Sequence, residues 1–190
     1  LFPDGFTMSA AETMAPDGRA DEVLDDLAEL VEQSLVQLVE RDGEGVRYRL
    51  LETVREFGRL RLESESALET VRGAMIAWGA AFGTEHQALR EVGAAQMRLF
   101  NETRSEVDNL VVILRWALSA GDAGAVAGIF AALGTHWSMR GTHSEILAVA
   151  QDVFDVLDGV ALPSDPLARD TLFTALVAAA SWSAFGSQRL

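Results

Sequence analysis

The chain has 190 residues, of which 49% are hydrophobic and 23% charged, and its 15 basic and 29 acidic side chains give a net charge of −14. This length allows one large domain or two small ones with a buried core. The chain has no cysteine, which excludes disulfides, thiolate nucleophiles and iron–sulfur clusters. With no apolar run of about 18 residues and no signal peptide, we expect a soluble, cytoplasmic protein without a membrane span.

The first part of the chain predicts two helices. Residues 6–15 predict a short helix, and Ala15-Pro16-Asp17-Gly18 predicts a turn. From Asp21, the expected N-cap, to about Leu35, apolar residues recur on one helical face. The opposite face is acidic and consists of Asp21, Glu22, Asp25, Asp26, Glu29 and Glu32. An acidic outer face opposes binding to the phosphates of nucleic acid.

A β-hairpin and a third helix follow. Strand patterns at residues 35–40 and 46–50 flank a glycine-containing loop. Alternation places Arg47 and Arg49 on one face of the second strand. Residues 51–62 predict a helix with Leu51, Val54 and Phe57 inward and Glu52, Arg55, Glu56 and Arg59 outward. Two helices, a hairpin and a helix within about sixty residues are typical of a winged-helix module that lacks its first helix.

The rest of the chain predicts only helices. Apolar periodicity indicates helices at residues 68–82, 94–120, 122–140 and 143–157, and from Pro166 onward. Thr142 and Glu145 form a capping-box pattern, and Asp165 is an expected N-cap. Long helices with short loops indicate antiparallel helix pairs stacked as a solenoid. Because the chain starts without methionine and stops inside an expected helix, we expect a piece of a longer protein.

No residue pattern indicates catalysis, and we expect neither an enzyme nor a cofactor or metal site in this chain. The three histidines, His86, His136 and His143, favour structural roles over metal binding, although His136 and His143 flank an expected turn. Three glycines, Gly121, Gly124 and Gly128, lack the spacing of a phosphate-binding loop, and no predicted strand precedes them. We therefore expect them to cap a helix and to allow close helix packing.

Two further groups of residues have alternative interpretations. The four tryptophans lie in apolar stripes that favour a core position, and the alternative is an aromatic groove. They are Trp78, Trp116, Trp137 and Trp182. Six arginines and four acidic residues between Arg41 and Arg61 form a net basic stretch. These charges either pair along a solvated helix face or form a binding surface for an acidic partner domain or an anion.

Three segments resemble bacterial STAND-type signalling ATPases, which are relatives of the NB-ARC proteins. VEQSLVQLVERDGEGVRYRLLETVREFGRLRLE, at residues 31–63, resembles the end of their winged-helix domain, and LFPDGF resembles the segment that enters it. Residues 105–145 resemble the TPR-like helical region of large actinobacterial transcription regulators. The resemblance implies a winged-helix-like module at residues 1–63, TPR-like repeats at 64–190, and an upstream P-loop ATPase module that holds ATP or ADP with magnesium.

One departure from this family concerns the nucleotide. Leu50, Leu51 and Glu52 stand where such winged helices often carry a Met-His-Asp-like motif. Because a leucine side chain cannot donate a hydrogen bond to a phosphate, we expect no nucleotide contact from Leu51. ATP, ADP and magnesium are therefore expected only in the upstream module.

The expected function is regulatory. We predict a non-catalytic, protein-interaction segment of a STAND-type transcription regulator, which couples the ATPase module to helical sensor repeats. The predicted contact with that module consists of Arg47, Arg49, Arg55 and Arg59. A second contact or pocket is predicted at Trp137, Arg140 and His143. A DNA-binding winged-helix regulator and a small-molecule sensor built on the helical repeats are the alternatives.

Overall fold

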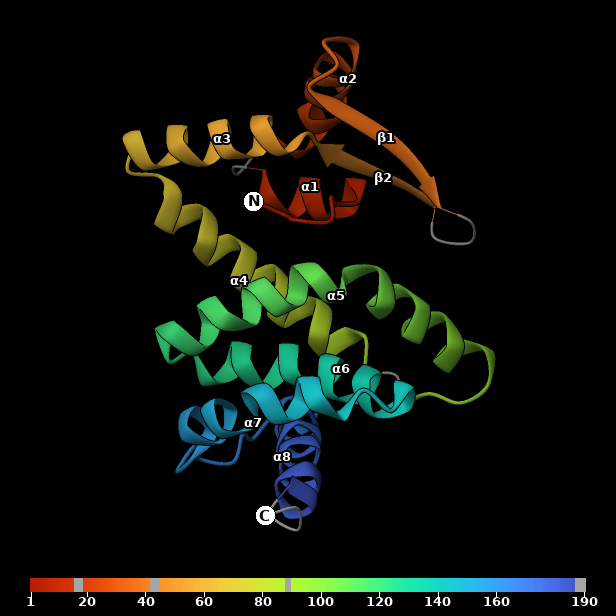
Figure 1. The fold of residues 1–190 in the computed structure, drawn as a ribbon, viewed down its shortest axis with the longest axis vertical. Coiled ribbons are helices and arrows are strands. Elements are labelled where there is room, and N and C mark those ends of the chain that lie inside the picture. Colours follow the sequence, from red (N-terminus) through yellow and green to blue (C-terminus); the bar gives the residue numbers. More distant parts are fainter. Residues whose placement is uncertain (16–18, 42–44, 88–89, 187–190) are drawn as a thin grey trace. The chain divides into compact units, whose positions relative to one another are not determined.

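The structure, a computed structural model, describes residues 1–15, 19–41, 45–87 and 90–186, without the side chains of residues 41 and 181–186 (Figure 1). The expected turn at 16–18, the hairpin loop at 42–44 and the side chains of Arg41 and Trp182 lie outside the described residues. The protein is mainly α-helical with one antiparallel hairpin, as predicted. It divides into two units, Leu1–Trp78 and Gly79–Leu190.

The first unit contains the hairpin. Its elements are α1 (Met8–Met14), the 3-10 turn η1 (Ala20–Glu22), α2 (Val23–Glu32), β1 (Val36–Arg41), β2 (Gly45–Leu50), α3 (Glu52–Ser64) and the start of α4 (Leu68–Glu85). Thr7 caps α1 by accepting a hydrogen bond from the Ala10 amide at 3.2 Å. Asp21 lies inside η1, and α2 begins after Glu22 without a side-chain cap. The prediction that Asp21 caps this helix is therefore wrong.

A short N-terminal segment pairs with the hairpin. The Phe6 amide donates to the Tyr48 carbonyl at 2.9 Å, and the Tyr48 amide donates to the Phe6 carbonyl at 2.8 Å. Gly5 has a φ of +77°, and a Cβ atom there would lie 2.4 Å from the Tyr48 oxygen. Only glycine fits this approach. The helix expected from residue 6 begins at Met8 because Phe6 is held by β2.

Aromatic rings from this segment fill the core of the first unit. Phe2 and Phe6 are buried, with the Phe2 ring edge-on to Trp78 at 5.2 Å and the Phe6 ring stacked on Tyr48 at 5.8 Å. The other buried apolar side chains of this unit are Ala10, Leu27, Val36, Leu68 and Met75. These residues come from the N-terminal segment, α1, α2, β1 and α4, whereas α3 buries no residue.

The second unit is entirely helical in its described residues. After the end of α4 come α5 (Ala94–Ala120), α6 (Ala123–Arg140), α7 (His143–Leu157) and α8 (Pro166–Gly186), close to the predicted bounds. Every residue of α6 from Ala125 to Trp137 is buried, and this helix packs against α5, α7 and α8 (Figure 1). None of the helices in the described residues combines the length and the apolar character that a membrane span requires.

The helix ends of the second unit test several predicted caps. Gly121 ends α5 with a φ of +65°, as expected for a cap. Asp165 accepts a hydrogen bond from the Ala168 amide at 2.7 Å, which confirms the cap of α8. Thr142 makes no side-chain cap at the start of α7. Its hydroxyl donates instead to the Trp137 carbonyl at 3.4 Å, so the predicted capping box is wrong.

Two glycines bring α4 and α6 into backbone contact. A Cβ atom on Gly83 would lie 2.2 Å from the Gly128 oxygen, and one on Gly128 would lie 2.7 Å from the Ala80 oxygen. The predicted packing role of Gly128 is therefore confirmed. Because the opposing atoms are backbone, neither position can gain a methyl group without moving a helix.

We predict that Gly128→Ala lowers the free energy of unfolding by about 1–3 kcal/mol through overpacking. Gly124→Ala is the matched control on the same helix, because a Cβ there meets only an ordinary contact of 3.6 Å with Asp122. The control should be neutral or stabilising by about 0.5–1 kcal/mol. Urea unfolding followed by circular dichroism measures both. Equal stability of the two variants would contradict the close contact.

Candidate interaction surface

Arg47 is a buried structural residue. Its side chain is 2% exposed, and Nη2 donates a hydrogen bond to the Gly5 carbonyl at 3.0 Å. The prediction that Arg47 points outward is wrong. Alternation correctly places Arg47 and Arg49 on one face of β2, but the N-terminal segment covers the Arg47 end of that face. Arg47 therefore cannot contact a partner while the unit is folded.

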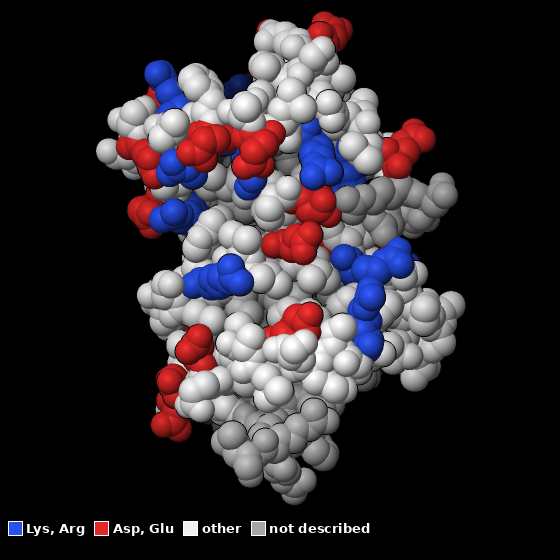
Figure 2. Space-filling view, in the orientation of Figure 1, with Lys and Arg blue, Asp and Glu red and all other residues white. Residues whose placement is uncertain are grey.

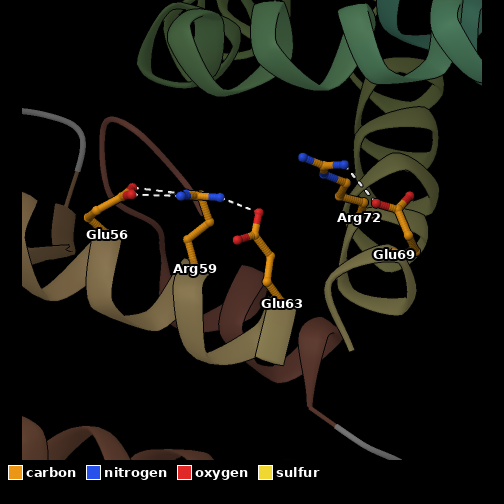
Figure 3. Close-up of polar contacts among 5 residues, drawn as sticks. All are labelled: Glu56, Arg59, Glu63, Glu69 and Arg72. Carbon is orange, nitrogen blue, oxygen red and sulfur yellow. Dashed lines mark hydrogen bonds and ion pairs between the residues drawn. The ribbon is translucent and has the colours of Figure 1, made fainter. Parts of the chain in front are cut away.

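Arg55 and Arg59 are held by acids on their own helix. Arg55 pairs with Glu52, and Arg59 pairs with Glu56 at 2.7 Å and also with Glu63, as Figure 3 shows for Arg59. The hydrogen bond from Arg59 lowers the pKa of Glu56 and raises the pKa of Arg59 itself. Acidic and basic side chains alternate over α3 in Figure 2. The alternative of Glu–Arg pairs along a solvated face is thus confirmed for Arg55 and Arg59 on α3, and such pairs stabilise a helix only weakly.

Arg49 is the exposed member of the predicted surface. Its side chain is exposed on β2, and it has no hydrogen bond or ion pair with any described residue. The four-arginine surface therefore reduces to Arg49 as an accessible cation with no partner among the described residues. Whether Arg49, Arg55 or Arg59 contacts another module stays a prediction.

An apolar face of α3 is exposed instead. Phe57 is 70% exposed and Leu60 is 51% exposed, although Phe57 was predicted to point inward. Thr53 and Ser64 are also exposed and fall on the same side by helical spacing. We call Thr53, Phe57, Leu60 and Ser64 the α3 surface. The polar Thr53 and Ser64 at this spacing are the sequence signal that could have identified an uncovered face.

The outer face of α2 and η1 is acidic, as predicted. All six carboxylates between Asp21 and Glu32 are exposed. Arg19, just before them, pairs with Glu22 at 2.7 Å and with Asp26 at 3.4 Å. This face therefore carries more negative than positive charge even after its ion pairs are counted.

The second predicted contact is only partly accessible. Trp137 is 5% exposed, with its ring edge-on to Phe130 at 6.4 Å, so it is a core residue. Arg140 is exposed and His143 is half-buried. A cavity of about 310 Å³ in the first unit and one of about 170 Å³ in the second are formed by described residues, and no tryptophan is among the described residues that line them. None of the three residues Trp137, Arg140 and His143 is among the described residues that line these two cavities.

The histidines have structural surroundings. His136 is 4% exposed and stacks on Phe100 at 4.6 Å. Burial, together with the positive charges of Arg140 and Arg104, lowers the pKa of His136 to about 4. His86 stacks on Phe82, and its Nε2 lies 3.0 Å from a Glu102 carboxylate oxygen. No group of three or more possible metal ligands occurs among the described residues.

The geometry of the first unit agrees with a known domain family. In chain order, a bridging residue, two helices and a two-stranded hairpin are followed by a helix. Residues 1–63 match the family described as a winged helix-turn-helix domain. No curated protein and no solved structure matches the chain. The winged-helix prediction is thus confirmed for residues 1–63, in which α1 and α2 precede the β1–β2 hairpin, or wing.

We predict that Arg47→Ala destabilises the winged-helix domain by about 1–3 kcal/mol, because the Gly5 carbonyl loses a buried donor. Arg49→Ala, two residues along the same strand, should change stability by less than about 0.5 kcal/mol, since that side chain is exposed. Urea unfolding of the two variants measures the difference. Similar losses from both substitutions would argue against a buried Arg47.

We also predict a pH dependence from His136. Its pKa in the folded protein lies below the ordinary value of 6.5, so the unfolded chain takes up the proton first as the pH falls. The stabilisation is complete above about pH 6.5 and is lost toward pH 4, by up to about 3 kcal/mol. His136→Phe keeps an aromatic ring and should flatten this part of the stability profile. Parallel profiles for the two proteins, measured by urea unfolding between pH 7 and 4, would contradict the assignment.

Proposed function

We propose that this chain is a regulatory protein-interaction segment whose winged-helix domain docks onto a protein through the α3 surface. The observation that carries the proposal is the exposure of Phe57 and Leu60, at 70% and 51%, on a helix that buries no residue fully. Exposed apolar side chains with a polar surround are characteristic of protein-binding surfaces. An aromatic anchor such as Phe57 is the kind of residue that contributes most to such contacts.

The charges around the α3 surface support an apolar contact. Arg55 and Arg59 already pair with Glu52, Glu56 and Glu63 on the same helix, so they do not have to find partners across an interface. A partner can therefore cover Phe57 and Leu60 without leaving these charges unpaired. Arg49, which is exposed on β2, is available for an acidic group of the same partner.

The acidic helix α2 supports a protein rather than a nucleic-acid partner. In a helix-turn-helix domain the second helix enters the major groove, where it faces phosphates on both sides. The exposed carboxylates of η1 and α2, from Asp21 to Glu32, would be repelled there. Arg19, the basic residue beside them, is held by Glu22 and Asp26.

The partner we propose is an ATPase module of the same protein, on the basis of the resemblance of residues 31–63 and 105–145 to STAND-type regulators. In this proposal the helices of the second unit act as TPR-like repeats that receive a signal, and the chain itself is non-catalytic. Leu51 is the residue before α3 and is 42% exposed. Its aliphatic side chain cannot donate a hydrogen bond to a phosphate. This supports the proposal that the nucleotide binds to the ATPase module and not to this chain.

DNA binding is the second candidate function. The match of residues 1–63 to a winged helix-turn-helix domain favours it, because many domains of this class bind DNA. An exposed Arg49 on the wing could contact a phosphate. The acidic α2 is the specific observation against it.

We predict that Phe57→Ala with Leu60→Ala weakens docking without unfolding the chain. Because both side chains are more than half exposed, the isolated chain should keep its stability within about 0.5 kcal/mol. In the natural protein that carries this chain, limited proteolysis should become faster because the winged-helix domain is released. Leu24→Ala is the matched control, since Leu24 is 59% exposed on α2. An unchanged digestion pattern would place the docking surface elsewhere.

A gel-shift experiment with duplex DNA separates the two candidates. We expect no sequence-dependent shift at physiological salt, for the wild type or for Arg49→Ala. A salt-dependent, sequence-specific shift that Arg49→Ala weakens would favour the DNA-binding candidate over protein docking.

A further inference from the structure

The first unit, Leu1–Trp78, which we call the winged-helix unit, contains an apolar cavity between α1, α2 and α4. Its volume is about 310 Å³, within the range of small-molecule sites. Twelve described residues line it, and among these twelve only Arg19 and Asp26 carry charged side chains. The apolar lining includes Phe2, Phe6, Met14 and Met75. This lining comes from helices and from the segment that pairs with β2, so the cavity is formed without a ligand.

The two charged residues at this cavity already have partners. Arg19 pairs with Asp26 at 3.4 Å and with Glu22 at 2.7 Å, and these side chains are more than half exposed. An anionic ligand at Arg19 would lie beside the carboxylates of Glu22 and Asp26, which would repel it. A neutral ligand leaves both ion pairs intact. Leu1 also lines the cavity, and burial lowers the pKa of its amino group, which disfavours the charged form. The ionisable groups at the cavity therefore favour a neutral molecule.

The side chains around the cavity favour an aromatic ring. Phe2 and Phe6 are aromatic lining residues, and thioethers such as those of Met14 and Met75 make favourable contacts with aromatic rings. An apolar cavity of about 150 Å³ is known to hold benzene, so roughly twice that volume suits two fused rings. Leu27 and Val71 extend the apolar wall. We infer that the winged-helix unit binds a small, neutral, two-ring aromatic molecule in this cavity.

Indole titration followed by the methyl signals of the methionines tests the inference. The chain has five methionines. Met14 and Met75 line the cavity, whereas Met97 and Met139 lie in the second unit at 52% and 43% exposure. We expect saturable shifts of the Met14 and Met75 methyls and none at Met97 and Met139. Indole-3-carboxylate should bind at least tenfold more weakly. No shift, or equal shifts at all four methyls, would overturn the inference.

Two cavity-filling variants test the position of the site, and circular dichroism shows whether each variant still folds. Ala11→Leu on α1 and Val71→Phe on α4 each place added carbon in the cavity and should weaken indole binding at least tenfold. Ala77→Leu is the matched control, because Ala77 is exposed on α4 and does not line the cavity. Unchanged binding by both filled variants, with both folded by circular dichroism, would overturn the site.

The same indole titration of the natural protein that carries this chain shows whether a small molecule or a side chain from elsewhere in that protein occupies the cavity. If Met14 and Met75 respond to indole there as they do in the 190-residue chain, the cavity is open to small molecules. If they respond only in the shorter chain, a side chain from elsewhere in the protein fills the cavity and the inference fails. Phe57→Ala with Leu60→Ala should leave indole binding unchanged, so this test is independent of docking through the α3 surface.

Discussion

The pairing of Phe6 with Tyr48 is the contact on which the winged-helix domain depends. Two backbone hydrogen bonds, at 2.9 and 2.8 Å, attach the N-terminal segment to β2. The same attachment brings the Phe2 and Phe6 rings into the core and places the Gly5 carbonyl against Arg47. A two-stranded hairpin alone is marginally stable in water, so this third segment and the helices that pack around it stabilise the hairpin.

This long-range contact explains why Arg47 could not be placed correctly from the sequence. Periodicity within β2 shows which residues share a face, and that part was right for Arg47 and Arg49. It does not show what covers the face. The covering carbonyl belongs to Gly5, which is 42 positions away in the chain. The prediction that Phe57 points inward was wrong for a related reason. An apolar stripe on a helix shows which residues share a face, but it does not show whether another element packs on that face.

Local patterns predicted most of the remaining fold and part of the candidate site. The bounds of α5, α6 and α7 follow apolar periodicity with stop signals such as Gly121 and Gly141, which adopt positive φ angles. The pairs of Arg59 with Glu56 and Glu63 follow from spacings of three and four residues on one helix. By contrast, the cavity beside Met75 depends on the distances between α1, α2 and α4, and no local pattern contains them.

The contact between Gly83 and Gly128 limits how the second unit can change shape. Packed side chains can adjust to small displacements by changing rotamer, but this contact is made of backbone atoms and has no rotamers. Backbone atoms therefore set a lower limit to the distance between α4 and α6 at this point, and a rotamer change cannot relax that limit.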